Sequence, residues 1–258
     1  MTQITAVPSW KLGGQKVSVD SLLLSSVQLS TYLSDQLLTC ASGFFFQRDD
    51  RLFLVTSRHV LIDEACAHRP DRVDIGLHTD PLNLATATRL SISLYQAGRA
   101  VWREITDQAG LVDIAAIEVP QRAIPPSRVF VAFSPAHLPT DPQPIEVGAT
   151  LSIVGFPRGF HDTLHHMPVV RAATLASQFG LRFQGQGYFL TDARTHRGSS
   201  GAPVVARAAL PADASLPWVL LGVHSSRLDV SPRDESQDEA LGLNCAWYSN
   251  SLLALTQD

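Results

Sequence analysis

The sequence of 258 residues lacks several features that would assign a protein class at once. Its three cysteines, Cys40, Cys66 and Cys245, are odd in number and scattered, which argues against a disulfide framework and a cysteine metal site. No stretch approaches the roughly 18 uninterrupted apolar residues of a membrane span, and the first residues lack the basic head and apolar core of a secretory signal. We therefore expect a cytoplasmic protein without a membrane partner.

Positive charge is also scarce. The formal net charge is −4, so no electrostatic footprint for a nucleic-acid partner is present. The one dense acidic run, "RDESQDEA" (Arg233 to Ala240), is interpreted as a solvated loop. With 45% hydrophobic and 17% charged residues, the composition is that of a globular protein long enough for one large all-β domain or two small ones.

Short apolar runs bounded by turn residues dominate, whereas long helical periodicity is rare. The stretch "SGFFFQRDDRLFLVTS" (Ser42 to Ser57) predicts a β-hairpin around a polar turn at residues 48–50. Further strands are indicated by "DIAAIEV", "TLSIVGF", "APVVA" and "WVLLGVHSS". The tail "CAWYSNSLLALTQD" (Cys245 to Asp258) is the best helix candidate, with Trp247, Leu252 and Leu255 on roughly one face.

Seven of the sixteen prolines lie between Pro120 and Pro144, which is typical of a crossing linker. They divide the chain into two strand-rich halves, so we predict two β-barrels joined by a long connection. The expected boundaries are a first barrel over 41–119, a linker over 120–146 and a second barrel with a C-terminal helix over 147–258. Residues 1–40 form an N-terminal segment that either packs across the barrels or binds a regulator.

The stretch "THRGSSGAPVV" (Thr195 to Val205) places two serines between glycines, which allow backbone conformations that a Cβ forbids. A serine hydroxyl becomes a nucleophile only with a nearby base and a third group that orients that base. His59, in "LVTSRHVL", follows a predicted strand, and Asp113, in "GLVDIAAIEV", begins one. These two are the candidate partners of Ser200, and Asp74 and Asp107 are rival orienters. The chain order His, Asp, Ser and the absence of G-x-S-x-G exclude an α/β-hydrolase.

These motifs together resemble the trypsin-like (chymotrypsin-fold) serine peptidases, and most closely their bacterial cytoplasmic or HtrA-like branch. The matching blocks run in order from about Ser42 to Ser226. They are "LVTSRHVL", "VDIAAIEV", the glycine-proline turn in "SIVGFPRGF", and "TDARTHRGSSGAPVV".

The resemblance implies two six-stranded antiparallel β-barrels with the active site in the cleft between them. It implies His59 as base and acid, Asp113 as orienter and Ser200 as nucleophile, with the N–H groups of Gly198 and Ser200 as the oxyanion hole. The substrate would be a protein or peptide, cleaved through an acyl-enzyme with no cofactor or metal. Ser199 stands where digestive relatives have an aspartate, so no tryptic-style zymogen cleavage is expected.

The strand "LLGVHSSR" (Leu220 to Arg227) resembles the strand that lines the primary specificity pocket. His224 occupies the Gly-x-His position of glutamyl endopeptidases and viral 3C-like proteases, and Thr195 matches their pocket-wall hydroxyl. With Arg194 and Ser225 nearby, such a pocket favours Glu or Gln at P1, the substrate residue before the cleaved bond.

Two further interpretations stay open from the sequence. The fold could serve as a silent or latent binding module, or an activating partner protein could control the enzyme. The histidines of "GFHDTLHHMP", namely His161, His165 and His166, are interpreted as an exposed loop and not as a metal site.

Overall fold

A single hairpin in the first half supplies side chains to two separate cores. Its strands β4 (Gln36–Arg48) and β5 (Arg51–Thr56) pair with Arg48 opposite Arg51, which confirms the predicted turn. Because side chains alternate along a strand, Phe44 and Phe46 enter the core between the two halves of the molecule. Phe45 enters the core of the first half instead.

The first half is a seven-stranded antiparallel sheet, and its strand order is β10-β13-β5-β4-β3-β6-β7. The all-β class is confirmed. For this half the prediction was a closed six-stranded barrel, and the structure has a seven-stranded sheet instead. Among the described residues, the end strand β10 is two residues long and forms no ladder with β7. Two small hairpins, β8–β9 and β11–β12, pair separately. The sheet also begins before the expected boundary at residue 41, because β3 belongs to it. The remaining bounds are β3 (Ser26–Leu33), β6 (Arg72–His78), β7 (Ala87–Ser93), β8 (Tyr95–Gln96), β9 (Arg99–Ala100), β10 (Trp102–Arg103), β11 (Thr106–Asp107), β12 (Gly110–Leu111) and β13 (Ala115–Glu118).

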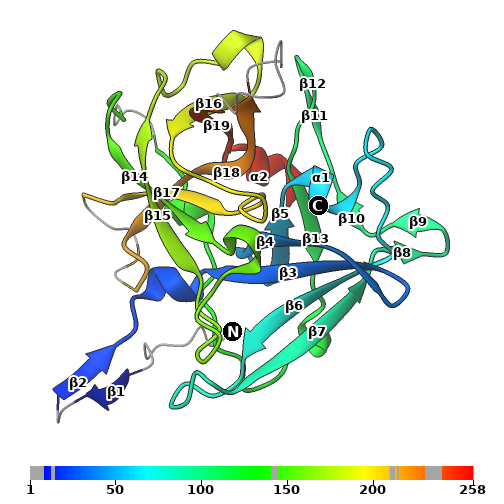
Figure 1. Cartoon of the computed structure of the whole chain (residues 1–258), viewed down its shortest axis with the longest axis vertical. Coiled ribbons are helices and arrows are strands. Elements are labelled where there is room, and N and C mark those ends of the chain that lie inside the picture. Colours follow the sequence, from blue (N-terminus) through cyan, green and yellow to red (C-terminus); the bar gives the residue numbers. More distant parts are fainter. Residues whose placement is uncertain are drawn as a thin grey trace.

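The second half is a closed six-stranded barrel, as predicted, in the order β14-β15-β16-β19-β18-β17. It lies beside the first sheet, and the short helix α2 (Ser251–Leu255) sits near the middle of the view (Figure 1). The strand bounds are β14 (Thr150–Gly155), β15 (Val169–Leu175), β16 (Tyr188–Asp192), β17 (Pro203–Arg207), β18 (Trp218–Asp229) and β19 (Ala240–Tyr248).

The predicted C-terminal helix is shorter than expected, and the prediction for its first part is wrong. Trp247 lies in β19, where it pairs with Tyr188 on β16 and Val223 on β18. Ladder hydrogen bonds on both sides outweigh the local helical pattern there. Trp247 still packs in the same core as Leu252 and Leu255 of α2. The spacing of these three residues in the sequence therefore indicated that they are buried together, and not that they lie on one continuous helix.

The proline-rich segment passes along the first sheet before it reaches the second half. The N–H of Phe133 donates to the Phe45 carbonyl, and the N–H of Val131 donates to the Leu24 carbonyl. Phe133 is fully buried between the halves. The segment therefore contributes to the core that joins the two halves and so helps to set the cleft between them.

The structure is a computed structural model that describes residues 9–12, 15–140, 145–209, 213, 215–229 and 240–257. Near the start, β1 (Ser9–Leu12) and β2 (Gln15–Ser18) pair as a separate hairpin. Within the described ranges no helix has the length and apolar character needed to cross a bilayer. The predicted acidic loop at 233–240 lies outside the described residues except for Ala240.

Candidate active site

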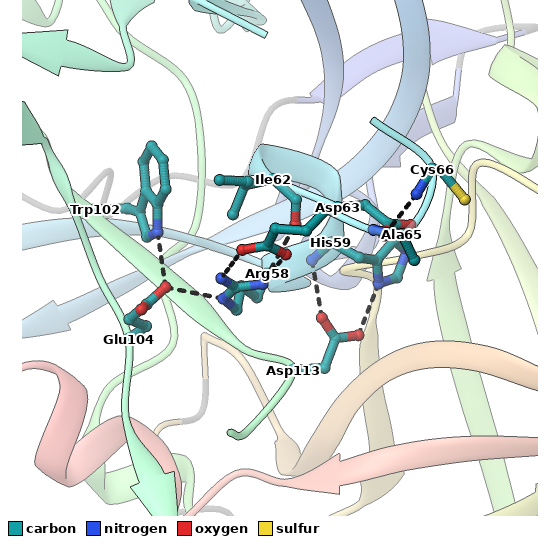
Figure 2. Close-up of polar contacts among 10 residues, drawn as sticks. Arg58, His59, Ile62, Asp63, Ala65, Cys66, Trp102, Glu104 and Asp113 are labelled. Carbon is teal, nitrogen blue, oxygen red and sulfur yellow. Dashed lines mark hydrogen bonds and ion pairs between the residues drawn. The ribbon is translucent and has the colours of Figure 1, made fainter. Parts of the chain in front are cut away.

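His59 and Asp113 meet through two hydrogen bonds at the end of the first-half hairpin. His59 lies on the one-turn helix α1 (Arg58–Leu61), directly after β5. Its Nδ1 is 2.7 Å from Oδ2 of Asp113, and its backbone N–H donates to Oδ1 at 2.8 Å (Figure 2). An acceptor at Nδ1 places the ring proton there, which leaves Nε2 with a lone pair. The imidazole is thus oriented as a base.

The Asp113 carboxylate accepts a third hydrogen bond, which comes from the second half of the chain. The Ser225 hydroxyl, from β18 of the second half, donates to Oδ2 at 2.5 Å. Burial by itself lowers the pKa of His59, but the hydrogen bond and charge of Asp113, assisted by Asp63, outweigh it and raise the pKa above its usual value of 6.5. The carboxylate therefore stabilises a protonated His59.

The two glycines around the serine pair are required by close contacts. Gly198 has φ 92° and Gly201 has φ 84°, conformations that favour glycine. A Cβ on Gly201 would lie 2.2 Å from the Ser42 carbonyl oxygen and from the Thr56 hydroxyl. One on Gly198 would lie 2.7 Å from the Arg158 nitrogen. The turn is therefore pressed against the first half, which places Ser200 at the junction.

Ser42, on β4, ties the serine turn to both halves. Its hydroxyl donates to the Gly198 carbonyl at 2.7 Å and accepts from the Phe156 N–H at 2.9 Å. Its own N–H donates to the Ser200 carbonyl at 3.0 Å. Sequence reasoning included Ser42 only as the start of a hairpin. No local pattern marks it, because these three partners lie more than 100 residues away.

The peptides around Gly198 are fixed by their carbonyl groups. The Arg197 carbonyl accepts from the Arg158 N–H at 2.5 Å, so in a trans peptide the Gly198 N–H points to the opposite side. Across the described residues, neither the Gly198 N–H nor the Ser200 N–H finds an acceptor. Two adjacent donors without acceptors are what an oxyanion would need.

His59 and Ser200 line one cavity of about 610 Å³, together with Gly198. The Ser200 hydroxyl donates to the Ser225 carbonyl at 2.9 Å, and no hydrogen bond to His59 is found in the described part of the chain. The sequence-predicted base and nucleophile are therefore brought to the same cavity, with the hydroxyl turned toward β18.

The four residues predicted to bind the substrate differ in their contacts and exposure. Ser225 supports Asp113, as described above, and the Thr195 hydroxyl bonds to Asn244. Arg194 is exposed. His224 is 2% exposed, and its Nδ1 has no hydrogen-bond partner among the described residues. Burial, with a smaller contribution from His59, lowers the pKa of His224 to about 4, so its imidazole is neutral.

Arg58, next to His59, anchors α1 from the other side and was missed by sequence reasoning. Its guanidinium pairs with Glu64 at 2.8 Å and with Glu104 at 2.9 Å, and the Trp102 indole also donates to Glu104 (Figure 2). The ion pair lowers the pKa of Glu64 to about 2. A basic residue beside the histidine was the available signal, but its acidic partners could not be paired from sequence.

The two rival carboxylates and the histidine loop each interact with other residues. Asp74 is buried against Arg72, and Asp107 pairs with Arg182, so neither orients His59. His165 bonds to Asp162 at 2.7 Å in a turn beside β15. Within the described residues, no group of three or more His, Cys, Asp or Glu is placed to hold a metal ion. All three cysteines are free thiols.

Residues 41–209 match the profile of the family described as "Trypsin-like peptidase domain". None of the curated proteins matches the sequence. The matched range begins on β4 and extends through β17, so it spans both halves and contains His59, Asp113 and Ser200.

Solved structures resemble the fold at low identity. The serine endoprotease from Yersinia pestis is 14% identical with a TM-score of 0.51, and the match covers 91% of this chain and 62% of that one. The chain thus spans less than two thirds of that protein. Rv3671c protease from M. tuberculosis, in its active form, is 15% identical with a TM-score of 0.47, over 91% of this chain and 80% of that one.

Proposed function

The chain belongs to the trypsin-like peptidase domain family, and on this premise we propose that it is a serine endopeptidase with a triad of Ser200, His59 and Asp113. Its fold is that of these hydrolases, with a closed six-stranded barrel and a second sheet enclosing the site. The observation that carries the proposal is the single cavity lined by both His59 and Ser200. The Asp113 hydrogen bond to Nδ1 supports it further.

In this proposal His59 Nε2 accepts the Ser200 proton as the hydroxyl oxygen attacks the substrate carbonyl. The hydroxyl first rotates away from the Ser225 carbonyl, a change between staggered rotamers. The N–H groups of Gly198 and Ser200 stabilise the oxyanion, and Asp113 stabilises the imidazolium. His59 then protonates the leaving amine and later activates the water that hydrolyses the acyl-enzyme.

A fluorophosphonate probe tests this assignment directly, because it reacts with an activated serine. We expect one adduct per chain, mapped by mass spectrometry to the peptide that contains Ser200 and absent in Ser200→Ala. Ser199→Ala is the matched control, since it removes the neighbouring hydroxyl, which is 3% exposed, and leaves Ser200 in place. An adduct that persists in Ser200→Ala would overturn the assignment.

One observation favours a second candidate, a latent or silent trypsin-like fold used as a binding module. The Ser200 hydroxyl is directed to Ser225 and not to His59. In a latent state an activating partner protein would have to turn it. Complete absence of labelling in the isolated protein, with labelling restored by a binding partner, would favour latency over a constitutive enzyme.

We further propose that the enzyme prefers Glu or Gln at P1, with His224 as the residue that reads it. A neutral imidazole cannot form an ion pair, but it can donate one hydrogen bond to a carboxylate or amide oxygen. Its buried, unpartnered nitrogen supports such a role. A P1-scanning peptide library provides the test, and preferred cleavage after Lys or Arg would contradict it.

Our proposal of a cytoplasmic location rests on the three free thiols, which suit a reducing compartment. Fractionation of the native host cells, followed by detection of the protein, tests it. Recovery from an extracytoplasmic fraction would contradict the proposal.

A further inference from the structure

Two arginines line the cavity that His59 and Ser200 also line. They are Arg158, in the turn after β14, and Arg197, directly before Gly198. Arg158 also lines an adjacent cavity of about 660 Å³. That second cavity is also lined by Arg171 and by His196, so arginines continue along one edge from the first cavity into the second.

The positive charge at this edge is not neutralised within the described structure. Among the described residues no acidic group forms an ion pair with Arg158, Arg171 or Arg197. The Nε of Arg171 and the Nδ1 of His196 are buried without a hydrogen-bond partner in the same part of the chain. Burial, followed by the charges of Arg171, Arg194 and Arg158, lowers the pKa of His196. Arginines without an acidic partner at this edge therefore contrast with the net charge of −4 of the whole chain.

The backbone holds the two arginines in a fixed relation to the oxyanion turn. Arg158 has φ 55°, a left-handed conformation that is unfavourable for a residue with a side chain. Its N–H donates to the Arg197 carbonyl, which joins the two arginine-bearing segments next to Gly198. Strain of this kind concentrates at functional positions. The backbone that carries both arginine side chains is thus fixed next to Gly198.

In the mechanism proposed above, the leaving group departs through this cavity. His59 protonates the leaving amine, so the substrate residues after the cleaved bond must pass His59. This cavity is lined by His59 and not by His224 or Thr195, which belong to the predicted P1 side. One carboxylate, Asp63, also lines it, but its Oδ1 accepts from the N–H groups of Ala65 and Cys66, close to His59.

We propose, resting on the endopeptidase function proposed above, that Arg158 and Arg197 form a subsite for an acidic side chain on the C-terminal side of the cleaved bond. A guanidinium matches a carboxylate with two parallel N–H donors, which gives such a subsite direction as well as charge. The enzyme then requires an aspartate or glutamate one or two positions after the cleaved bond for efficient turnover.

Peptides that share every residue up to the cleaved bond test the subsite. They carry Glu, Gln or Lys at the first or the second position after it, and kcat/KM is measured for each. We expect Glu to exceed Gln by about tenfold in at least one position, with Lys lowest. In Arg158→Gln and Arg197→Gln the Glu-to-Gln ratio falls toward one. Arg99→Gln, an exposed position on β9, makes the same charge change and keeps the ratio.

A binding measurement separates failure of the subsite from failure of the enzyme. Fluorescence anisotropy of a labelled peptide with Glu after the cleaved bond is followed with Ser200→Ala protein, where no turnover is needed. Binding about tenfold weaker after the added change Arg158→Gln supports the subsite, even if no peptide is cleaved. Equal cleavage of the Glu, Gln and Lys peptides by unlabelled protein, whose activity is established separately by fluorophosphonate labelling of Ser200 in a parallel sample, overturns the subsite alone. Equal binding by both proteins also overturns it.

Discussion

The two sides of this cleft, which carry His59 as the proposed base and Ser200 as the proposed nucleophile, are stabilised by different interactions. His59 is positioned by charge, with Asp113 on one face of α1 and the Arg58 ion pairs with Glu64 and Glu104 on the other. Ser200 is positioned by backbone, in a turn whose glycines take positive φ and whose carbonyls bond to Ser42 and Arg158. Side-chain charges thus fix the position of His59, the proposed base, and main-chain geometry fixes the position of Ser200, the proposed nucleophile.

The difference has a consequence for mutational sensitivity. Removing a charge near His59 should alter protonation and turnover while the fold persists, since the residues concerned lie at the surface of the cleft. Adding a single atom to the serine turn should disturb the fold itself, because Gly201 is pressed against β4 and β5. The following substitutions test this division.

Ser200→Ala should remove turnover entirely and leave the thermal midpoint nearly unchanged. Only one partly exposed oxygen and its hydrogen bond to the Ser225 carbonyl are lost, which costs about 0.5–1.5 kcal/mol of unfolding free energy. Peptide hydrolysis and thermal unfolding measure the two effects. Turnover equal to that of the wild type would show that another residue is the nucleophile.

Asp113→Asn should reduce kcat by roughly 10⁴-fold, the loss known for the equivalent substitution in trypsin-like serine peptidases, because an amide favours the wrong His59 tautomer. Ser225→Ala removes one donor from the same carboxylate and should cost only about tenfold. Steady-state kinetics on one peptide rank the two. A larger loss in Ser225→Ala than in Asp113→Asn would contradict the role of Asp113 as orienter.

Gly201→Ala should destabilise the protein by roughly 3 kcal/mol, from a left-handed φ and overlap with the Ser42 carbonyl. Gly76→Ala is the matched control, because a Cβ there meets nothing within 4 Å. Chemical denaturation of both variants gives the comparison. If the two free energies of unfolding were the same, the serine turn would not be packed as described.

The acid limb of kcat/KM should lie above pH 6.5, because His59 must be neutral to act as base and its pKa is raised by Asp113 and Asp63. Activity is then lost as pH falls through that pKa. Asp63→Asn should move the limb to lower pH, and by less than loss of Asp113 would, since Asp63 is the last of the causes that raise the pKa of His59. A limb that moved to higher pH would reverse the assigned sign.

Local pattern in the sequence predicted only some parts of the fold and site. The hairpin around residues 48–50, the second-half barrel and the order of His59, Asp113 and Ser200 follow from alternation, turns and motif spacing. The pairing of residues distant in the chain could not be predicted. The contacts of Ser42 with Gly198, of Ser225 with Asp113 and of Arg58 with Glu104 each exist only after the sheets assemble. Likewise Trp247 fits a helical spacing until its strand partners are known.

The central claim is that an imidazole from the first half activates a hydroxyl from the second. The rate of fluorophosphonate labelling at Ser200, followed by intact mass from about pH 5 to about pH 9, tests it most directly, because this range brackets the usual histidine pKa. We predict a rate that rises through one ionisation above pH 6.5, since the pKa of His59 is raised above that value, and that collapses at every pH in His59→Ala. A labelling rate at Ser200 that is unchanged in His59→Ala would contradict the account.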